Sequence, residues 1–336
     1  MSIPQTYDFI DYLAAKKTID DRSLNRTVWN RLQSELADQE PVERLRVLEI
    51  GSGIGTMIER MAAGPLMRRS SLYTAVDINP DCTRAARRRL SRWAKRVGFT
   101  VTRKKDASHL LEVGNSRIRV TINTGDVHTL VSKAASHPCG LILAHAFMDL
   151  VDIQTLLPGM MGLLENGGLL FLSLNFDGDT VLLPAIAPDF DDRVIHFYHR
   201  SMDERIVGGR PAGDSRTGRR LLVKLLECKS EILAAGASDW IVCPRRRRYP
   251  PGESYFLHYI VHTIDEELAH HPEIDPDHFK AWIAKRHAQI ENGELVFMAK
   301  HIDVLARKNG RKRRKAVLRL PCPVVAGDGC RGKLKR

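Results

Sequence analysis

The sequence predicts an α/β protein with a largely parallel sheet, and three observations lead to that prediction. From Leu45 onward, short apolar runs alternate with longer amphipathic stretches, the pattern of strands joined by crossover helices. The first apolar run ends in a glycine-rich turn that leads into a helical pattern. The chain has 336 residues, of which 43% are hydrophobic and 27% charged. This composition suits a chain that buries a full core and excludes collagen, a disulfide miniprotein and a disordered tail.

A helical cap is expected ahead of the sheet. Residues 8–37 carry apolar side chains at helical spacing, most clearly from Leu24 to Leu36. The acidic pair that begins at Asp20 precedes this stripe and suits a helix start. We therefore assign residues 1–40 to an N-terminal helical cap.

Seven segments are predicted to be sheet strands, because each is a short apolar run bounded by polar or turn residues. The longer stretches between them are expected to be helices, the clearest at 81–97, 154–165 and 217–235. The strands are expected at 46–50, 71–76, 118–122, 140–145, 168–174, 239–243 and 294–306.

Two segments are too long to be plain connections. Residues 176–216 and 244–292 interrupt the alternation, and insertions of this length commonly form lids or binding elements. We assign residues 41–306 to one domain that carries both insertions. A smaller departure lies at 99–117, where the turn signal at Gly114 predicts a hairpin before the third sheet strand.

The positive charge of the chain is concentrated at its C-terminal end. The net charge is +12, but residues 307–336 hold 12 Lys or Arg and one Asp, so residues 1–306 carry only +1. The tail lacks periodicity, and we expect it to be disordered. Nucleic-acid contact through this tail stays open, but we do not favour it, because the excess charge lies outside the predicted folded part.

The sequence also bears on location and redox state. No run approaches the about 18 apolar residues of a spanning helix, and the first residues lack a secretory pattern, so we expect a cytoplasmic protein without a membrane partner. The six cysteines are scattered without a C-x-x-C motif, which favours reduced thiols over disulfides or a zinc site, and no metal is expected. Pairing of Cys322 with Cys330 stays open as a minor alternative. The oligomeric state is not predicted.

The strongest functional signal is the segment VLEIGSGIGT at 47–56. An apolar strand reaches Glu49 and then passes into three alternate glycines, Gly51, Gly53 and Gly55. Glycine is required where the backbone turns sharply and where a ligand approaches amide groups closely, because a Cβ would obstruct both. The dinucleotide fingerprint needs a further glycine where this chain has Thr56, so a dinucleotide is disfavoured. A turn without ligand is the alternative.

Two acidic residues follow later strands. Asp77 ends the strand in YTAVDINPD, where a carboxylate can accept hydrogen bonds from both hydroxyls of a ribose. Asp126 follows the strand before TGDVHTL. With the amide of Val127 it can pair with an adenine edge, since the carboxylate accepts from the exocyclic amine and the amide donates to a ring nitrogen. The structural alternatives are a helix cap for Asp77 and a turn residue for Asp126.

In this order and spacing, the three segments resemble the class I S-adenosylmethionine-dependent methyltransferases. The resemblance covers residues 45–175 and returns in the strands at 239–243 and 294–306. It implies a seven-stranded, Rossmann-like methyltransferase sheet with an antiparallel last strand, and S-adenosyl-L-methionine as the cofactor. Glu49 and the glycines would surround the methionine part. The resemblance implies these cofactor-binding residues: Glu49, Gly51, Ser52, Gly53, Gly55, Thr56, Asp77, Ile78, Asp126 and Val127.

The segment after the fourth strand, LILAHAFMDLVD, is where reaction classes of this family differ. It lacks the Asn-Pro-Pro-aromatic motif of enzymes that methylate base amines or glutamine amides, which disfavours those acceptors. His145 is placed where a substrate-facing group would leave the sheet, and it is our candidate general base for a hydroxyl or carboxyl acceptor. A hydrogen-bonded core histidine is the more common alternative.

Further groups are open to two interpretations. Arg245 to Arg248 follow a predicted strand and can bind an anionic substrate or form a solvated face. The cluster His196 to His199 can wall a pocket or pack under a lid, and Arg22, Asn25 and Trp29 can close over the cofactor or form plain helix surface. The basic helix at 81–97 has an apolar stripe, so an amphipathic crossover helix explains it, with nucleic-acid contact as the alternative.

Together, these residues predict methyl transfer from S-adenosylmethionine to a small-molecule acceptor, with an anionic acceptor as one option. The alternatives are an RNA or protein methyltransferase that uses the basic tail, and a non-catalytic module that only binds the cofactor. No motif identifies the acceptor or the atom that is methylated.

Overall fold

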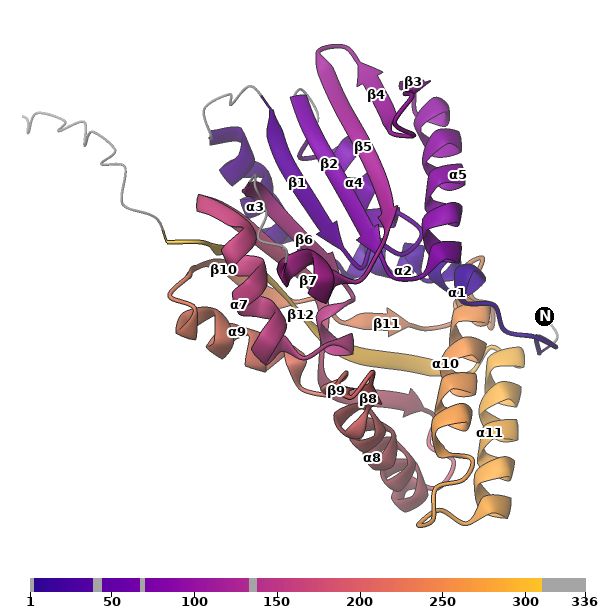
Figure 1. Ribbon diagram of the computed structural model, residues 1–336. Helices are drawn as coiled ribbons and strands as arrows, with labels where there is room; N and C mark the ends of the chain where they lie inside the picture. The colour runs from indigo at the N-terminus through magenta and orange to yellow at the C-terminus, as the bar shows by residue number, and fades with distance from the viewer. Residues whose placement is uncertain (1–2, 39–43, 67–69, 133–137, 310–336) are drawn as a thin grey trace, which may run out of the picture.

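The computed structural model describes residues 3–38, 44–66, 70–132 and 138–309, and a ten-stranded sheet forms its centre (Figure 1). β1 (Leu45–Ile50) lies in the middle, parallel to β2 and β6. Outward from β2 lie β5, β4 and β3; outward from β6 lie β7, β12 and β10, and β11 also pairs with β12. The other strands are Ser70–Asp77 (β2), Thr100–Arg103 (β3), His109–Val113 (β4), Ser116–Thr124 (β5), Cys139–His145 (β6), Leu164–Leu183 (β7), Glu231–Ala237 (β10), Trp240–Val242 (β11) and Val296–Arg307 (β12).

The sheet confirms the predicted fold class. The neighbours β5, β2, β1, β6 and β7 are parallel, and β12, the last described strand, runs antiparallel to β7. The predicted hairpin is present as β3 and β4, and Gly114 turns the chain from β4 into β5 with a φ of +53°. A glycine adopts this left-handed conformation without the strain that a Cβ would add.

Two predicted boundaries are wrong. The helix expected at 217–235 ends early: α9 covers Thr217–Glu227, Lys229 takes a φ of +55°, and β10 follows. The segment EILAAGA has a helix-like composition, but pairing with β12 outweighs this weak local propensity. β7 continues to Leu183, so the first part of the insertion expected at 176–216 extends the sheet.

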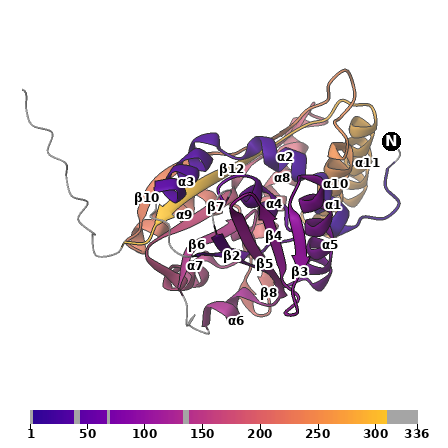
Figure 2. The same ribbon diagram turned by 90° about the horizontal axis from the view of Figure 1, so that it is seen from above.

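Helices cover both faces of the sheet. α3 (Arg26–Asp38), α4 (Thr56–Ala63) and α5 (Pro80–Arg96) share a core with alternate strand residues such as Val47. On the opposite face, α6 (Val127–Ser132), α7 (Ile153–Leu163) and α9 pack against the intervening residues, such as Leu48. Figure 2 shows α3 and α7 on opposite sides of the sheet. The alternation along each strand thus divides the core into two layers.

The predicted cap consists of three helices. α1 (Phe9–Ala15) and α2 (Lys17–Ser23) lie at the carboxyl edge of the central strands, and α3 packs on the sheet face (Figure 1). Asp20 and Asp21, expected ahead of a helix, lie inside α2, because the helical stretch begins earlier. The cap therefore covers an edge and a face of the sheet.

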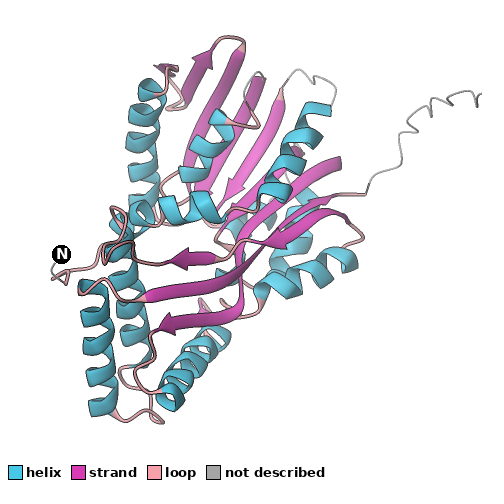
Figure 3. Cartoon of the chain, turned by 180° about the vertical axis from the view of Figure 1, so that it is seen from behind, coloured by secondary structure: helices cyan, strands magenta, loops and turns pink. Residues whose placement is uncertain are grey.

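The insertions build a second core beyond the sheet. α8 (Pro188–Glu204), α10 (Glu253–Leu268) and α11 (Pro276–Glu291) group around the far ends of β7 and β12 (Figure 3). A short hairpin of β8 (Ile206–Val207) and β9 (Arg210–Pro211) follows α8. Aromatic side chains such as Phe256 and Trp282 fill this core, which also takes in Ile19 of the cap. Both predicted insertions thus contribute to one packed unit.

Leu32 tests whether the cap belongs to the cooperative fold. Its side chain is fully buried between α3 and the sheet, so Leu32→Ala should lower the free energy of unfolding by about 2–5 kcal/mol. Ser34→Ala, at an exposed position of the same helix, should change it by less than about 0.5 kcal/mol. Urea unfolding measures both. Equal stabilities of the two variants would show that α3 is not part of the core.

Candidate functional site

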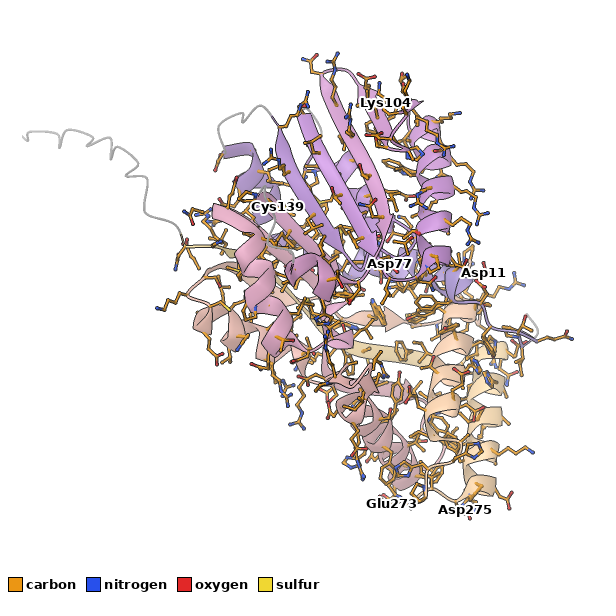
Figure 4. All side chains as sticks on the ribbon, viewed as in Figure 1. Asp11, Asp77, Lys104, Cys139, Glu273 and Asp275 are labelled. Atoms are coloured by element: carbon orange, nitrogen blue, oxygen red, sulfur yellow. The ribbon has the colours of Figure 1, made fainter. Side chains whose placement is uncertain are left out.

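The order of the strands marks one position on the sheet. After β1 the chain builds β2 and β5 on one side and then returns to β6 on the other side of β1. Ligands of open α/β sheets bind outside the carboxyl ends of the strands at such a reversal. Figure 4 shows Asp77 at this edge near Asp11 of α1, and Lys104 at the opposite end of the sheet.

The glycine turn lies at this edge and is hydrogen-bonded to the end of β2. Gly51, Gly53 and Gly55 all have positive φ angles, of +66°, +51° and +79°. The amide of Gly53 donates to Asp77 Oδ2 at 2.7 Å, and the amide of Asn79 donates to Oδ1 at 2.9 Å. Because each carboxylate oxygen has two lone pairs, Asp77 can accept further hydrogen bonds from a ligand. The carboxylate is thus held beside the turn.

The structure also resolves one of the alternatives raised for the acidic residues. Asn79, not Asp77, caps α5, since the Asn79 side chain accepts from the amide of Asp81. Asp126 does act at a helix start, because it accepts from the amide of His128 at 3.0 Å. Val127 follows Asp126 as the first residue of α6, and its side chain is buried. Asp77 and Asp126 therefore end neighbouring segments at the same edge, because β2 and β5 pair in parallel.

Glu49 is buried beneath the turn. Its side chain is 1% exposed and accepts a hydrogen bond from Tyr73 Oη at 2.7 Å. Burial raises the pKa of Glu49 to about 8, although the hydrogen bond from Tyr73 and the charge of Arg60 act in the opposite direction. Glu49 is thus largely protonated at neutral pH. A cation placed nearby would stabilise its ionised form.

The remaining predicted cofactor residues surround the turn. Ser52 is buried, and its hydroxyl has no hydrogen-bond partner among the described residues. Thr56 begins α4, and Arg60 donates to its hydroxyl at 3.2 Å. Ile78 is 72% exposed beside Asp77, which is unusual for a large apolar side chain and leaves it free to contact a ligand. An unpartnered hydroxyl and an exposed apolar side chain fit a ligand with polar and flat apolar parts.

Two apolar side chains rest on the glycines. A Cβ on Gly51 would lie 2.2 Å from the ring of Phe147, and a Cβ on Gly53 would lie 3.4 Å from Leu13 of α1. The glycines therefore allow close approach, and Phe147 and Leu13 use that space here. A ligand that reaches these amides has to displace the ring of Phe147 from Gly51.

His145 is a buried member of a charged network. Its Nδ1 lies 2.8 Å from Ser173 Oγ, and its Nε2 lies 3.2 Å from Asp20 Oδ2 and 3.1 Å from Arg60 Nη1. The nitrogen Nε2 can donate to Asp20 or accept from Arg60, but it cannot do both. Burial, together with the charge of Arg60, lowers the pKa of His145 to about 4. This geometry favours the alternative raised above, a hydrogen-bonded core histidine, over a general base.

Asp149 is a candidate that the sequence analysis missed. It lies in the short 3₁₀ helix Met148–Leu150 that follows β6, and its Oδ1 is buried without a hydrogen-bond partner among the described residues. Burial raises its pKa to about 6. The sequence held a signal for it, because Asp149 belongs to the same segment after the fourth predicted strand as His145.

The backbone is strained beside Asp149. Ala146 and Leu174 take positive φ values, of +49° and +53°, at the carboxyl edge of β6 and in the adjoining part of β7. Non-glycine residues rarely adopt this conformation, and such strain clusters at functional sites. The amide of Leu174 is held by Asp303 Oδ1 at 2.7 Å.

The remaining candidate groups were open to a ligand-binding or a structural interpretation, and the structure treats them differently. Arg245 to Arg248 form an exposed turn, and Arg247 pairs with Glu294, as expected of a solvated face. His196 and His199 line a hollow of about 500 Å³, whereas the two aromatic residues between them are buried. Arg22 pairs with Glu253, Asn25 bonds to the backbone of Ala237, and Trp29 packs on Phe171, so these three have structural roles.

The sequence also led to expectations about membrane spans, metal binding and cysteines. Within the described ranges, no helix is both long and apolar enough to cross a membrane, and no group of three or more His, Cys, Asp or Glu side chains could hold a metal ion. Cys82, Cys139, Cys228 and Cys243 are free thiols. Cys322, Cys330 and most of the basic tail lie outside the described residues.

Comparisons with known proteins add a likeness in fold. No protein-family model and no curated protein sequence matches the chain. Two similar solved structures are S-adenosylmethionine-dependent methyltransferases in complex with S-adenosylhomocysteine. The one from Thiobacillus denitrificans is 13% identical with a TM-score of 0.42, and the alignment covers 90% of this chain and 99% of that one. The one from Geobacter sulfurreducens is 14% identical with a TM-score of 0.40, covering 85% and 92%. The ligand of this chain has to be inferred from its own residues.

The pKa of Glu49 leads to a prediction for stability. Between its ordinary pKa of 4.5 and its folded pKa of about 8, the folded protein keeps a proton that the unfolded chain releases, so this contribution to stability is lost as pH rises through 8. Glu49→Gln mimics the protonated side chain and avoids that loss. Its free energy of unfolding relative to wild type should rise from pH 5 to pH 9, by an amount on the order of a few kcal/mol.

Urea unfolding at a series of pH values measures this difference. Glu227→Gln is the control, because the Glu227 side chain is 58% exposed and should give a curve parallel to that of wild type. If the Glu49→Gln curve were also parallel to wild type, Glu49 would not be the buried, protonated group described above.

Proposed function

We propose that the chain is an S-adenosylmethionine-dependent methyltransferase. One observation carries the proposal: the Asp77 carboxylate accepts a hydrogen bond from the glycine turn. This contact lies at the carboxyl edge of the sheet, where the strand order reverses. A carboxylate at that place accepts from ribose hydroxyls, and glycine amides beside it allow close approach of the rest of a nucleoside ligand.

The adenosine part would lie along β2 and β5. Asp77 supports the ribose because both of its oxygens are already oriented by backbone amides. Asp126 and the amide of Val127 would meet the adenine edge; as the first residue of α6, Val127 has no hydrogen-bond partner for its amide within that helix. Ile78 would offer its exposed apolar surface to the base.

The methionine part would lie over the glycine turn. The unpartnered hydroxyl of Ser52 is available for its carboxylate. The amides of Ser52, Gly53 and Gly55 already donate to Val76, Asp77 and Ser52, so they hold the shape of the turn. The ammonium would lie near Glu49, whose pKa would then fall, because a nearby cation favours the charged carboxylate. The cofactor supplies an electrophilic methyl group, so the chain has chiefly to orient the acceptor and exclude water. Phe147 and Leu13 lie over Gly51 and Gly53. When the cofactor displaces them from these glycines, they would pack against the cofactor.

The acceptor is proposed to be a small molecule, enclosed by the cap and the insertions. Lys16 and Arg60 are buried at this edge, but Asp20 and Asp21 pair with them, so their charge alone does not select an anionic acceptor. Asp149 is the base that the geometry supports best, because its unpartnered oxygen and raised pKa of about 6 suit proton removal near neutrality. Removal of a proton from a hydroxyl or carboxyl acceptor would leave Asp149 protonated as the methyl group is transferred.

Asp77→Ala tests the cofactor site. Loss of the carboxylate should weaken S-adenosylhomocysteine binding by at least about tenfold, since two hydrogen bonds to a charged group are lost. The matched control is Asp81→Ala, at a 63% exposed carboxylate four residues along the chain, which should bind as wild type does. Calorimetry gives the affinities, and thermal unfolding shows whether each variant is folded. Equal affinity of a folded Asp77→Ala protein and wild type would contradict the ribose assignment.

Deletion of residues 310–336, which leaves β12 and its hydrogen bonds in place, tests the alternative acceptors. If the acceptor is a small molecule, the truncated protein should keep its turnover, because the folded part is nearly neutral without the tail. An RNA methyltransferase that uses the tail would lose affinity and salt dependence on truncation. Methyl transfer from labelled cofactor to metabolite pools and to RNA is the measurement. Cofactor binding without transfer to any pool would favour the non-catalytic module.

A further inference from the structure

A basic hollow lies away from the proposed cofactor site, between α5 and the β3–β4 hairpin. Its volume is about 430 Å³, within the range of small-molecule sites. Figure 4 shows Lys104 of this hairpin region at the end of the sheet opposite to Asp77. The lining residues are Arg87, Arg88, Ser91, Lys95, Val101, Arg103 and His109.

The cations that line the hollow differ from their neighbours on α5. Arg84 pairs with Asp81 at 3.0 Å, and Arg89 pairs with Glu59 at 2.7 Å. Among the ion pairs of the described residues, by contrast, none involves Arg88, Lys95 or Arg103. The hollow therefore gathers positive charge that the protein itself leaves uncompensated.

His109 gives a second, independent indication of a ligand. Its side chain is only 6% exposed, and its Nδ1 is buried without a hydrogen-bond partner among the described residues. Burial lowers the pKa of His109, and the charges of Arg103 and Arg87 lower it further. An unpartnered buried nitrogen is costly, and a ligand in the hollow can satisfy it.

Part of the hollow is fixed before any ligand arrives. The guanidinium of Arg87 donates to the carbonyl of Ile122, and the hydroxyl of Ser91 donates to the carbonyl of Arg87. Arg88 and Lys95 are seven residues apart on one helix, a rise of about 10 Å, and Arg103 faces them from β3. Cations from two elements thus converge on one space.

We propose that this hollow binds phosphate groups of an anionic ligand. Guanidinium groups bind phosphate oxygens through paired hydrogen bonds, and Lys95 adds a point charge. A phosphate oxygen within reach of His109 would accept a hydrogen bond from its Nδ1 in the matching tautomer. The phosphate can belong to a phosphorylated small molecule or to a nucleic-acid strand.

Two double variants of the full-length protein test the site. Arg88→Ala with Lys95→Ala removes two lining cations. Arg92→Ala with Arg96→Ala removes the same charge from exposed positions of α5 that do not line the hollow. Pyrophosphate and a short single-stranded RNA are the probes, measured by calorimetry and by fluorescence anisotropy at constant ionic strength. Because the basic tail is present in every protein, the difference between variants reports on the hollow.

The lining variant should bind at least about tenfold more weakly than wild type, and the control variant within about twofold. Selective loss for pyrophosphate supports a phosphorylated small molecule, and selective loss for RNA supports a strand. Equal losses in both variants, or no binding of either probe by wild type, would overturn the proposal. S-adenosylhomocysteine affinity should be unchanged in both variants, so failure here is distinct from failure of the cofactor site.

Discussion

The buried carboxylate of Asp20 is the constraint on which the arrangement of the site depends. It is 1% exposed, and the ammonium of Lys16, Arg60 and a hydrogen bond with His145 hold its pKa well below its usual range despite burial. Its second oxygen accepts from Trp240 Nε1 at 3.1 Å. A buried charge is tolerated only where such partners surround it, and removing one of them leaves the others uncompensated.

Those partners come from parts of the chain that would otherwise be independent. Lys16 and Asp20 belong to the cap, Arg60 to the helix after the glycine turn, and His145 to the strand at the reversal of order. Trp240 belongs to β11 and packs on Phe256 in the insertion core. One carboxylate therefore positions the cap over the turn, which brings Leu13 onto Gly53. Burial and the charge of Arg60 keep His145 neutral, and its ring nitrogens are engaged with Ser173 and Asp20. This makes Asp149, four residues further along the chain, the better candidate for acceptor chemistry.

Local sequence patterns were enough to predict the central sheet and the position of the glycine turn. Strand periodicity and turn residues are short-range signals, and β1, β2, β5 and β6 follow them closely. The carboxylate at Asp77 was also predictable, since a strand end, a polar residue and a helix start occur within a few residues. β10 was missed because its alanines favour a helix until an antiparallel neighbour is available.

The Asp20 network was beyond prediction for a different reason. It depends on contacts between residues far apart in sequence, such as Asp20 with Trp240, and no local pattern encodes burial of that kind. The placement of Phe147 on Gly51 is a similar case. Sequence reasoning proposed residues for a ligand to contact, whereas the structure shows what holds these residues in place and what covers them.

A crystal structure of the protein with S-adenosylhomocysteine tests the central claim most directly. The account predicts the ribose hydroxyls on Asp77, the adenine beside Val127, and the ring of Phe147 moved away from Gly51. Density for the ligand at another place, with Phe147 still resting on the glycine, would contradict it.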